Sequence, residues 1–531
     1  MKKFTPSRND ISPSCMMLAV LIGVTSLAQP SFAQLRTWDA GGDGLTWTDP
    51  LNWSDDDAPD TVGESALIDG DTFIDSTVTL TQTSGAYETG AVTIDAGDLL
   101  TFKGGYSNSS GTLNATSLTN SGNFNTFNGG GSNNGAAIAN VGVLTNNSGA
   151  SILVQNSSGS NRKQAIISFD SSTSVNNGEI TVTQTGNADR SGVQLRLNSS
   201  GTFINNGTIN IDFNRATASS GTAQLTIADA VTLGGTGEVI LKTTAEDRAQ
   251  IHSRTVGETI TNGINHTISG AGIIGAGDRN VTNSGDTLTS TTANVVNDGL
   301  IKATDASIRL RIFPNATATN SATGRIVGEA AGGIYIGSDT AARSFINNGL
   351  LEARSGSSVT FGSMNTDTLN GTIAGGGDFI GTLSLSGSAT LEAGDLANAD
   401  GTGTSTVGGM DITGDLALAD TTILNFQLGD NSAAGISFDT IAVSGALTLD
   451  GILNVDDLAG FGAGSYRLFT FSSGNLTDNG LTLGSTPGAY TYSIDADNAG
   501  GFVDLNVIPE PSTFVLLVGS FGLLYFMRKR R

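Results

Sequence analysis

The phrase Ile204-Asn205-Asn206-Gly207-Thr208-Ile209, continued by Asn210-Ile211-Asp212-Phe213, decides the fold that the sequence predicts. It indicates a strand, a tight corner and a second strand, because Asn and Gly are the residues that most readily accept positive φ. After the corner, apolar side chains occupy every second position, as they do in a strand with one buried face. We therefore expect one core-facing side and one polar side.

Variants of this phrase recur between residues 90 and 390, at irregular spacing. Gly178 and Gly207 are 29 residues apart, whereas Gly299 and Gly349 are 50 apart. This excludes a strictly periodic repeat but fits a solenoid with turns of about 15 to 30 residues and variable loops. The sequence therefore predicts an all-β, elongated right-handed parallel β-helix over residues 91–395. The other recurrences are Thr119–Gly122, Val175–Ile180, Val296–Ile301 and Ile346–Leu351.

A set of antiparallel sandwiches is the main alternative, since Asn-Gly corners are also preferred hairpin turns. Beyond residue 395 the strands become more apolar, as in Thr422–Leu428 and Tyr466–Phe471. We expect residues 396–506 to close the array as a β-rich cap that ends in a strand over Gly501–Val507. This region, including the phrase Phe438–Gly445, resembles the C-terminal end of autotransporter passenger repeats.

Composition narrows the class of protein. The 531 residues include 72 Gly but only 14% charged residues, which suits short strands and many turns better than long helices. The net charge of −24 excludes nucleic acid as an expected partner, because phosphate backbones are bound by clustered basic residues. Cys15 is the single cysteine, so no disulfide can form within the chain.

The first 33 residues have the pattern of a secretory signal peptide. Lys2, Lys3 and Arg8 precede an apolar run over residues 16–28, which is too short to span a membrane. Small residues follow, and cleavage is expected between Ala33 and Gln34. The pattern predicts Sec-type export machinery and a signal peptidase as partners.

The last 25 residues, 507–531, combine three features. Two prolines disfavour regular structure in the motif, which should be an extended linker. The apolar run over residues 514–527 reaches about 21 Å as a helix, a marginal transmembrane span against roughly 30 Å of hydrocarbon. The motif is Pro509, Glu510, Pro511, Ser512 and Thr513; the expected membrane-anchor residues are Phe514, Leu516, Leu517, Val518, Phe521, Leu523, Leu524 and Phe526; the basic tail is Arg528, Lys529, Arg530 and Arg531.

This arrangement resembles the PEP-CTERM sorting signal. The resemblance implies recognition by an exosortase, removal of the tail, and delivery to the cell surface or an exopolysaccharide matrix of a Gram-negative-type bacterium. The membrane would then be a partner at least transiently, through the C-terminal helix. An ordinary, uncleaved C-terminal anchor is the alternative on physical grounds alone.

All three tryptophans, Trp38, Trp47 and Trp53, lie near the start of residues 34–90. We expect them to plug the open end of the array, because repeat proteins need capped ends. The alternative is a glycan-binding platform, since Trp offers a large apolar face beside polar neighbours. That alternative requires the rings to be coplanar and exposed.

Residues that could form a metal site are few. His252 and His266, the two histidines, lack partners at a metal-ligand spacing, so no zinc site is expected. A calcium ion could be held by Asp55-Asp56-Asp57, or by Asp69-Gly70-Asp71 with Asp75. We interpret these aspartates instead as acidic turns that keep the surface soluble, and expect no cofactor.

Catalytic residues are not expected either. No Gly-x-Ser-x-Gly nucleophile motif occurs between a strand and a helix. Two charged clusters could serve a polysaccharide lyase or hydrolase on a pectin lyase-like β-helix: Asp189 with Arg190, and Glu246-Asp247-Arg248 with His252. The sequence predicts a non-enzymatic structural or adhesive surface protein associated with exopolysaccharide, and such an enzyme is the alternative.

Overall fold

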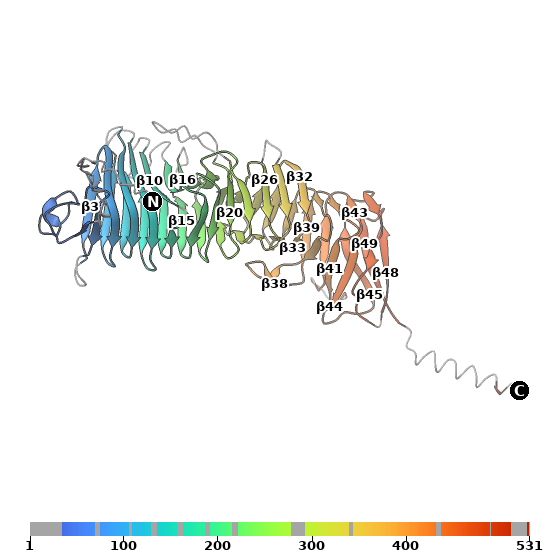
Figure 1. Ribbon diagram of the computed structural model, residues 1–531. Helices are drawn as coiled ribbons and strands as arrows, with labels where there is room; N and C mark the ends of the chain where they lie inside the picture. The colour runs from blue at the N-terminus through green and yellow to red at the C-terminus, as the bar shows by residue number, and fades with distance from the viewer. Residues whose placement is uncertain are drawn as a thin grey trace, which may run out of the picture.

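The computed structural model describes residues 34–510 and 528–529, and the structural statements that follow refer to these residues. The chain forms one elongated rod, a solenoid whose turns are built from β-strands, with the first strands at one end and the last at the other (Figure 1). Residues 1–33, 511–527 and 530–531 are outside the description. So are the internal residues 70–74, 106–108, 129–134, 157–162, 171, 186–191, 215–220, 278–291, 339–342, 432–436 and 489.

Three ladders of parallel strands form the three faces of the rod. Each full turn of the chain contributes one strand to each ladder, so residues far apart in sequence pair side by side. Face III is a sheet of sixteen strands. Its strands are β3 (Thr77–Gln82), β5 (Leu99–Gly104), β7 (Asn123–Asn128), β9 (Ser151–Gln155), β12 (Glu179–Gln184), β15 (Thr208–Phe213), β18 (Glu238–Thr243), β21 (Thr267–Gly270), β24 (Leu300–Ala303), β27 (Arg325–Gly328), β30 (Leu350–Ala353), β33 (Thr372–Gly375), β36 (Thr390–Ala393), β41 (Ile423–Leu428), β44 (Ile452–Asp457) and β47 (Thr482–Leu483).

Faces I and II are joined at the N-terminal end, where three long strands bend and run along both. These are β4 (Gly85–Ile94), β6 (Gly111–Asn120) and β8 (Gly135–Asn146). Beyond them, face I consists of β10 (Lys163–Phe169), β13 (Gly192–Leu197), β16 (Thr222–Ile227), β19 (Ala249–Ser253), β22 (Gly272–Ile274), β25 (Leu310–Ile312), β28 (Ile334–Ile336), β31 (Ser358–Phe361), β34 (Asp378–Ile380), β39 (Gly409–Thr413), β42 (Thr440–Val443) and β45 (Gly464–Thr470). Face II consists of β1 (Gln34–Thr37), β2 (Glu64–Ile68), β11 (Val175–Asn176), β14 (Gly201–Asn205), β17 (Val231–Gly234), β20 (Thr259–Asn262), β23 (Asn294–Asn297), β26 (Thr317–Asn320), β29 (Arg343–Asn347), β32 (Met364–Leu369), β35 (Leu383–Ser384), β40 (Leu416–Ala417), β43 (Leu447–Leu449) and β46 (Leu476–Asp478).

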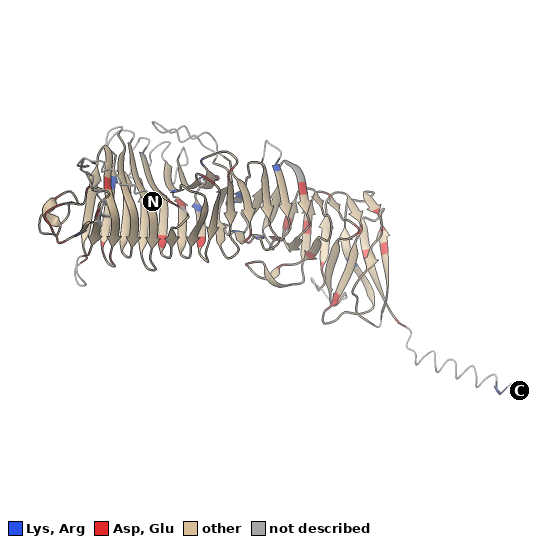
Figure 2. Cartoon of the chain, viewed as in Figure 1, with Lys and Arg blue, Asp and Glu red and all other residues tan. Residues whose placement is uncertain are grey.

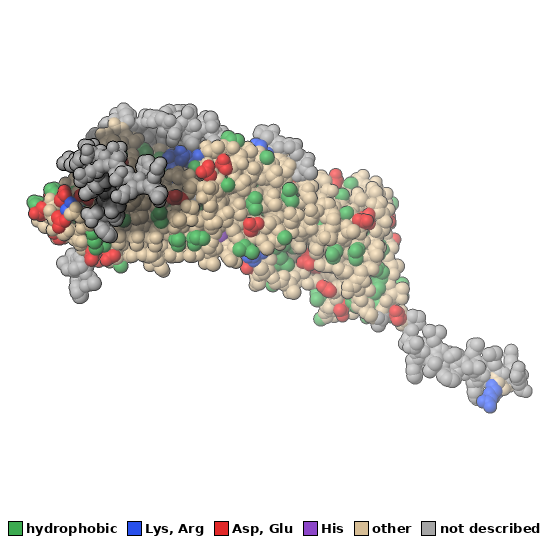
Figure 3. Space-filling model, in the orientation of Figure 1, with side chains coloured by type: hydrophobic (Ala, Val, Ile, Leu, Met, Phe, Trp, Pro, Cys, Tyr) green, Lys and Arg blue, Asp and Glu red, His purple; other side chains and the backbone are tan. Residues whose placement is uncertain are grey.

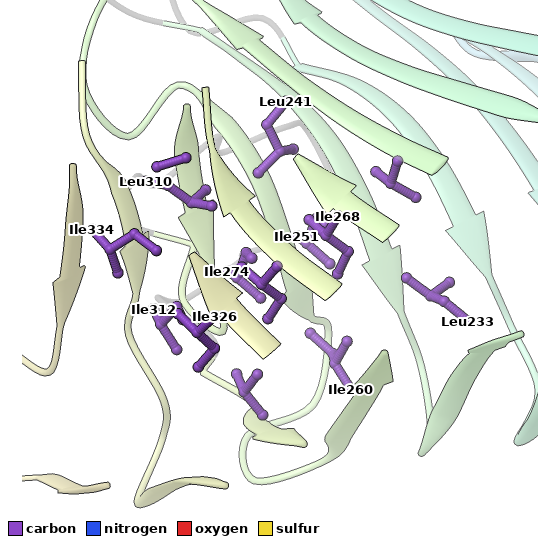
Figure 4. Close-up of a cluster of buried hydrophobic side chains, with 14 of the residues drawn as sticks. Leu233, Leu241, Ile251, Ile260, Ile268, Ile274, Leu310, Ile312, Ile326 and Ile334 are labelled. Atoms are coloured by element: carbon purple, nitrogen blue, oxygen red, sulfur yellow. The ribbon is translucent and has the colours of Figure 1, made fainter. Parts of the chain in front are cut away.

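The core is a narrow apolar column enclosed by the three faces. Alternation on β15 places Ile209, Ile211 and Phe213 inward and fully buried, as predicted. Figure 4 shows the same arrangement farther along the rod, where Leu233 from face II, Leu241 from face III and Ile251 from face I belong to one buried cluster. Burial of apolar surface, which contributes about 25 cal/mol for each Å² removed from water, is the main favourable term for such a stack.

The parallel pairings decide between solenoid and sandwiches. Between named strands, the described part shows antiparallel pairing in the hairpin β37 (Leu396–Asn398)–β38 (Thr402–Ser405) and at the C-terminal end. The parallel stack begins with β1 and β2 and extends to β44 and β47. The β-helix was predicted for residues 91–395, and the stack extends beyond both ends of that range.

The rod closes at its C-terminal end by a change of strand direction. There β48 (Tyr490–Asp497) and β49 (Phe502–Pro509) form a hairpin, and β49 pairs antiparallel with β45. Tyr466 on β45 is fully buried, and its hydroxyl donates to the carbonyl of Gly429 at 2.9 Å. The predicted terminal strand is confirmed, but it continues to Pro509 rather than ending at Val507.

Helix is almost absent from the described residues. The 3₁₀ turn η1 (Pro50–Asn52) has Asp49 as its N-cap, whose side chain accepts from the Leu51 amide. No helix among the described residues is long and apolar enough to span a membrane. The predicted membrane-anchor residues, Phe514 to Phe526, lie outside the described part.

The Asn-Gly corners differ from the sequence prediction in their physical basis. Gly178, Gly207, Gly299 and Gly349 do not have positive φ. Each instead lies against the turn before it, and a Cβ on Gly207 would clash with the carbonyl oxygen of Gly178. Glycine is therefore required at these corners by close approach of stacked backbone, not by a left-handed conformation.

Buried asparagines form a ladder at the corner between faces II and III. Each ends a strand. In all but Asn205 and Asn347, Nδ2 donates to the Oδ1 of the asparagine one turn further on, at 2.7–2.8 Å. Each Nδ2 also donates to a backbone carbonyl of face III, as Asn120 does to Ser151 at 2.9 Å. The ladder residues are Asn120, Asn146, Asn176 and Asn205, followed after a gap by Asn262, Asn297, Asn320 and Asn347.

Candidate binding face

The tryptophans lie at the N-terminal end of the core. Trp38, Trp47 and Trp53 are only 2%, 0% and 0% exposed, and their rings meet edge to face with centroids 4.8 and 5.2 Å apart. The indole Nε1 of Trp53 donates to the carbonyl of Trp47, and that of Trp47 donates to the Tyr87 hydroxyl. The alternative of an exposed, coplanar glycan platform is therefore wrong, because the rings fill the end of the core.

The aspartates considered for calcium surround an arginine. Arg36 is buried, and its guanidinium contacts Asp55 at 2.8 Å, Asp57 at 2.6 Å and Glu64 at 2.9 Å. The hydrogen bond to Arg36 holds the pKa of the Glu64 carboxyl below its usual value. Among the described residues, no group of three or more His, Cys, Asp or Glu side chains is arranged to hold a metal ion.

The structure describes only part of the second calcium candidate. Asp69 and Asp75 are described, but Gly70 and Asp71 lie outside the described residues. Calcium binding by either set, the alternative to the acidic turns that the sequence favoured, stays untested.

The charged cluster Glu246-Asp247-Arg248 lies beside the outer side of face I. Asp247 forms an ion pair with Arg311 at 2.6 Å, and Glu246 with Arg309 at 3.3 Å. The two arginines also stack on the ring of Tyr335, with guanidinium-to-centroid distances of 4.9 and 5.2 Å. The two carboxylates are thus engaged in ion pairs that reach from the turn of β19 to that of β25, across the intervening turn of β22. The other candidate pair, Asp189 and Arg190, lies outside the described residues.

Neither histidine has the surroundings of a general base poised near neutral pH. Burial lowers the pKa of His252 and of His266 to about 4. His252 Nδ1 lies 2.9 Å from the carbonyl oxygen of Ser253. His266 belongs to the buried asparagine ladder, between Asn205 and Asn262.

A surface groove of about 390 Å³ crosses the corner between faces I and II. Four successive turns contribute to it: the middle of β6, the middle of β8, the end of β10 and the residues after β13. Its position follows from the bend in the long strands at that corner. The lining residues are Asn114, Ala115, Asn140, Val141, Gly142, Ser168, Asp170, Asn198 and Ser199.

Hydrogen bonds connect the polar side chains of this groove across the turns. Ser168 Oγ donates to Asn140 Oδ1 at 2.7 Å, and Asn140 Nδ2 donates to Asn114 Oδ1 at 2.9 Å. Asn114 Nδ2 then donates to Glu88 Oε1 at 2.6 Å. The result is an ordered row of amide and hydroxyl groups parallel to the axis of the rod.

Asp170 is the carboxylate of the groove. It accepts hydrogen bonds from the Ser199 hydroxyl and from the amide and hydroxyl of Ser172, and the Ser199 bond is the largest cause of its lowered pKa. It is therefore ionised at neutral pH and acts as an acceptor.

The sequence did not single out the groove residues. A signal was present, since Asn114 and Asn140 each precede a ladder asparagine by six residues. The equivalent serine, Ser168, is offset by loop length, so the row could not be extended from spacing alone.

The structure describes part of the segment predicted for sorting and the residue that follows the predicted cleavage site. Gln34 begins β1, directly after the predicted cleavage site, and Ala33 lies outside the described residues. Ile508, Pro509 and Glu510 are exposed as the chain leaves β49. The motif residues Pro511, Ser512 and Thr513 lie outside the described part, as do Arg530 and Arg531.

No known protein-family description matches the chain. A segment of 88 residues is 47% identical to part of the adhesin BmaC autotransporter of Brucella suis biovar 1 (strain 1330). This segment resembles an autotransporter adhesin. It covers 16% of the chain and 2% of the adhesin, so the match concerns a small fraction of that relative's length. The likeness agrees with the β-solenoid and with the resemblance to passenger repeats found in the sequence.

Proposed function

We propose that this protein is an exported, non-enzymatic adhesive rod of the bacterial surface. The observation that carries the proposal is the continuous parallel solenoid, which holds rows of outward side chains at a fixed spacing along its length. On the face that Figures 2 and 3 show, most of the described surface is uncharged, and acidic residues are scattered along it. The likeness of one segment to an autotransporter adhesin supports an adhesive role.

Sorting by an exosortase is the second part of the proposal. The closure of the rod by β49 supports it, because the chain emerges there as the exposed residues Ile508, Pro509 and Glu510. A processing enzyme needs such an accessible segment. Pro509 is the last residue of β49, and its missing N–H disfavours extension of the sheet beyond it. The role of the mature rod would then be in the exopolysaccharide matrix or on the cell surface.

A polysaccharide lyase or hydrolase is not proposed. Its best described carboxylates, Glu246 and Asp247, are engaged by Arg309 and Arg311. A glycosidase requires a pair of carboxyl groups that face the scissile bond. These two side chains instead connect turns of the solenoid.

The test of the sorting proposal is to locate the protein in its native cell and to identify its ends by mass spectrometry. The test variant is Pro509→Ala with Pro511→Ala. The control is Pro50→Ala with Pro314→Ala, which removes two prolines on turns far from β49 and the tail. We expect a chain that starts at Gln34, lacks residues 514–531 and reaches the outside in the wild type and the control alone. An intact tail on a membrane-bound protein in all three strains would contradict exosortase sorting.

The adhesive role is tested separately by attachment. Cells that lack the protein should attach less well to a surface or to matrix material than wild-type cells, and the wild-type chain should restore attachment. Equal attachment with and without the protein would contradict the adhesive role but not the sorting proposal.

A further inference from the structure

The groove between faces I and II has an apolar floor and a polar rim. Ala115 and Val141 form a small apolar floor, and Gly142 also lines the groove. Gly142 cannot be replaced easily, because a Cβ there would clash with the carbonyl oxygen of Thr116. The opening is therefore fixed by the way in which β6 and β8 stack.

The polar rim retains hydrogen-bonding capacity. An asparagine side chain offers two N–H groups and two lone pairs. Asn140, which is exposed, uses one N–H on Asn114 and one lone pair on Ser168. One N–H and one lone pair of Asn140 are thus not used in hydrogen bonds to the described residues. Asn198 is also exposed, and its Oδ1 accepts from Arg254 Nη1 at 3.3 Å.

Charge selects the class of ligand. Among the described residues, the lining contains amides and hydroxyls and one carboxylate, Asp170, but no basic residue; Arg254 reaches it only through its contact with Asn198. An anionic ligand would meet this carboxylate on a chain whose net charge is −24. A neutral, polyhydroxylated ligand matches the amide and hydroxyl groups instead, and its C–H surfaces match the floor at Ala115 and Val141.

The direction of the groove selects a linear ligand. Its lining comes from four successive turns, and parallel strands are spaced by about 4.8 Å, so the row spans roughly 14 Å along the axis. We propose that this groove, built around Asn114, Asn140 and Asn198, binds a neutral linear glycan that lies along the axis of the rod. The inference rests on the proposed surface role only for the source of that glycan.

The test is isothermal titration of the full mature chain with neutral hexasaccharides of glucose and mannose: cellohexaose, laminarihexaose, maltohexaose and mannohexaose. Hexagalacturonate is the anionic comparison. We expect at least one neutral hexasaccharide to bind, and to bind more tightly than hexagalacturonate. Asn140→Ala with Asn198→Ala should weaken that binding about tenfold, because two exposed hydrogen-bonding groups are lost.

A matched control removes two asparagines that bridge turns at another corner. Asn206 Nδ2 donates to Asn177 Oδ1 at 2.9 Å, outside the groove, so Asn177→Ala with Asn206→Ala should leave the affinity unchanged. The proposal is overturned if no neutral hexasaccharide binds, if both double variants weaken binding equally, or if hexagalacturonate binds best. Since the assay uses purified protein, a failure here leaves the export and attachment tests intact, and the converse also holds.

Discussion

At the scale of single residues, the buried asparagine ladder is the feature that ties successive turns together. It has a consistent donor direction from Asn120 to Asn347, and His266 continues it across the turn that lacks an asparagine. Asn205 Nδ2 lies 3.1 Å from His266 Nε2, and His266 Nδ1 lies 2.7 Å from Asn262 Oδ1. In that turn Gly234 pairs with Ile204 and Leu233 pairs with Asn262, so no asparagine occupies the ladder position. The imidazole fills the space that a missing amide would leave.

Replacing one ladder residue tests its energetic importance. In Asn176→Ala, Asn146 Nδ2 and Asn205 Oδ1 each lose a buried partner, and an unsatisfied buried polar group costs about 1–3 kcal/mol. We expect the free energy of local opening to fall by about 2–4 kcal/mol, measured by hydrogen exchange at the neighbouring amides. The partly exposed neighbour Asn177 provides the control. Asn177→Ala should change the free energy of local opening by less than about 0.5 kcal/mol. Equal effects of the two substitutions would refute a special role for the ladder.

The pH dependence of stability should reveal His266. Burial lowers its pKa to about 4, and its Nε2 faces the N–H of Asn205, so the fold favours the neutral ring. Because the folded pKa lies below the unfolded value near 6.5, this stabilisation is present above pH 6.5 and is lost as the pH falls toward 4. The loss at full protonation is on the order of 3 kcal/mol.

The measurement compares the wild type with His266→Gln, which keeps an amide in the ladder but does not titrate. Other titrating groups are common to both proteins, so the difference in melting temperature between pH 7.5 and 4 isolates His266. A larger drop is expected for the wild type. If the melting temperature falls equally in the two proteins between pH 7.5 and 4, the pH dependence does not come from His266.

At the scale of elements, the β37–β38 hairpin leaves the solenoid and returns to cover part of face III. Leu396 joins Leu350 and Ala374 in a small separate apolar cluster. Glu352 is fully buried beneath the hairpin, where its Oε1 accepts from the Leu396 amide at 2.9 Å and contacts Arg354 at 3.1 Å. Arg354 also donates to the carbonyl of Asn398. The hairpin is thus held by one buried carboxyl and its arginine.

The attachment of this hairpin should weaken as the pH rises. Burial raises the pKa of Glu352 to about 7, so the stabilisation from its protonated form is complete below about pH 4.5 and is lost as the pH passes 7. Between pH 6 and 8, amides of Leu396 and Thr402 should lose protection in the wild type, after correction for intrinsic exchange. Glu352→Gln should remove that dependence, whereas Glu329→Gln, on the preceding turn, should not. A pH-independent hairpin in the wild type would contradict this.

At the scale of the whole molecule, the rod depends on closure at both ends. The tryptophan cluster fills the core at the first turns, and the antiparallel strands β48 and β49 close the last. Between the ends, each turn contacts mainly its neighbours, as in other repeat proteins, so stability is distributed along the array. An open end would expose apolar core and unpaired strand edges, which favour aggregation.

Tryptophan fluorescence should therefore report on one end alone. All three tryptophans are buried in the N-terminal turns, while circular dichroism reports on strands along the whole rod. In urea, we expect the fluorescence transition at a lower concentration than the circular dichroism transition, because arrays unfold readily from their ends. Trp53→Phe should move the fluorescence transition to a lower urea concentration and should move the circular dichroism transition less. Coincident transitions in the wild type would show instead that the rod unfolds as a single unit.

The sequence by itself determined the local features of this protein. Alternation in Thr208–Phe213 predicted strands with one buried side, and the recurrent Asn-Gly phrases predicted the corners between strands, because both depend on a few adjacent residues. The sequence favoured a parallel stack over antiparallel sandwiches, and the strand pairings decided between them. The tertiary structure decided which distant residues meet. Loops of unequal length set the register between turns, so spacing could not reveal that His266 substitutes for an asparagine or that Asn114, Asn140 and Asn198 line one groove. Burial of Trp47 and Trp53 likewise depended on where the first turns place the open end of the core.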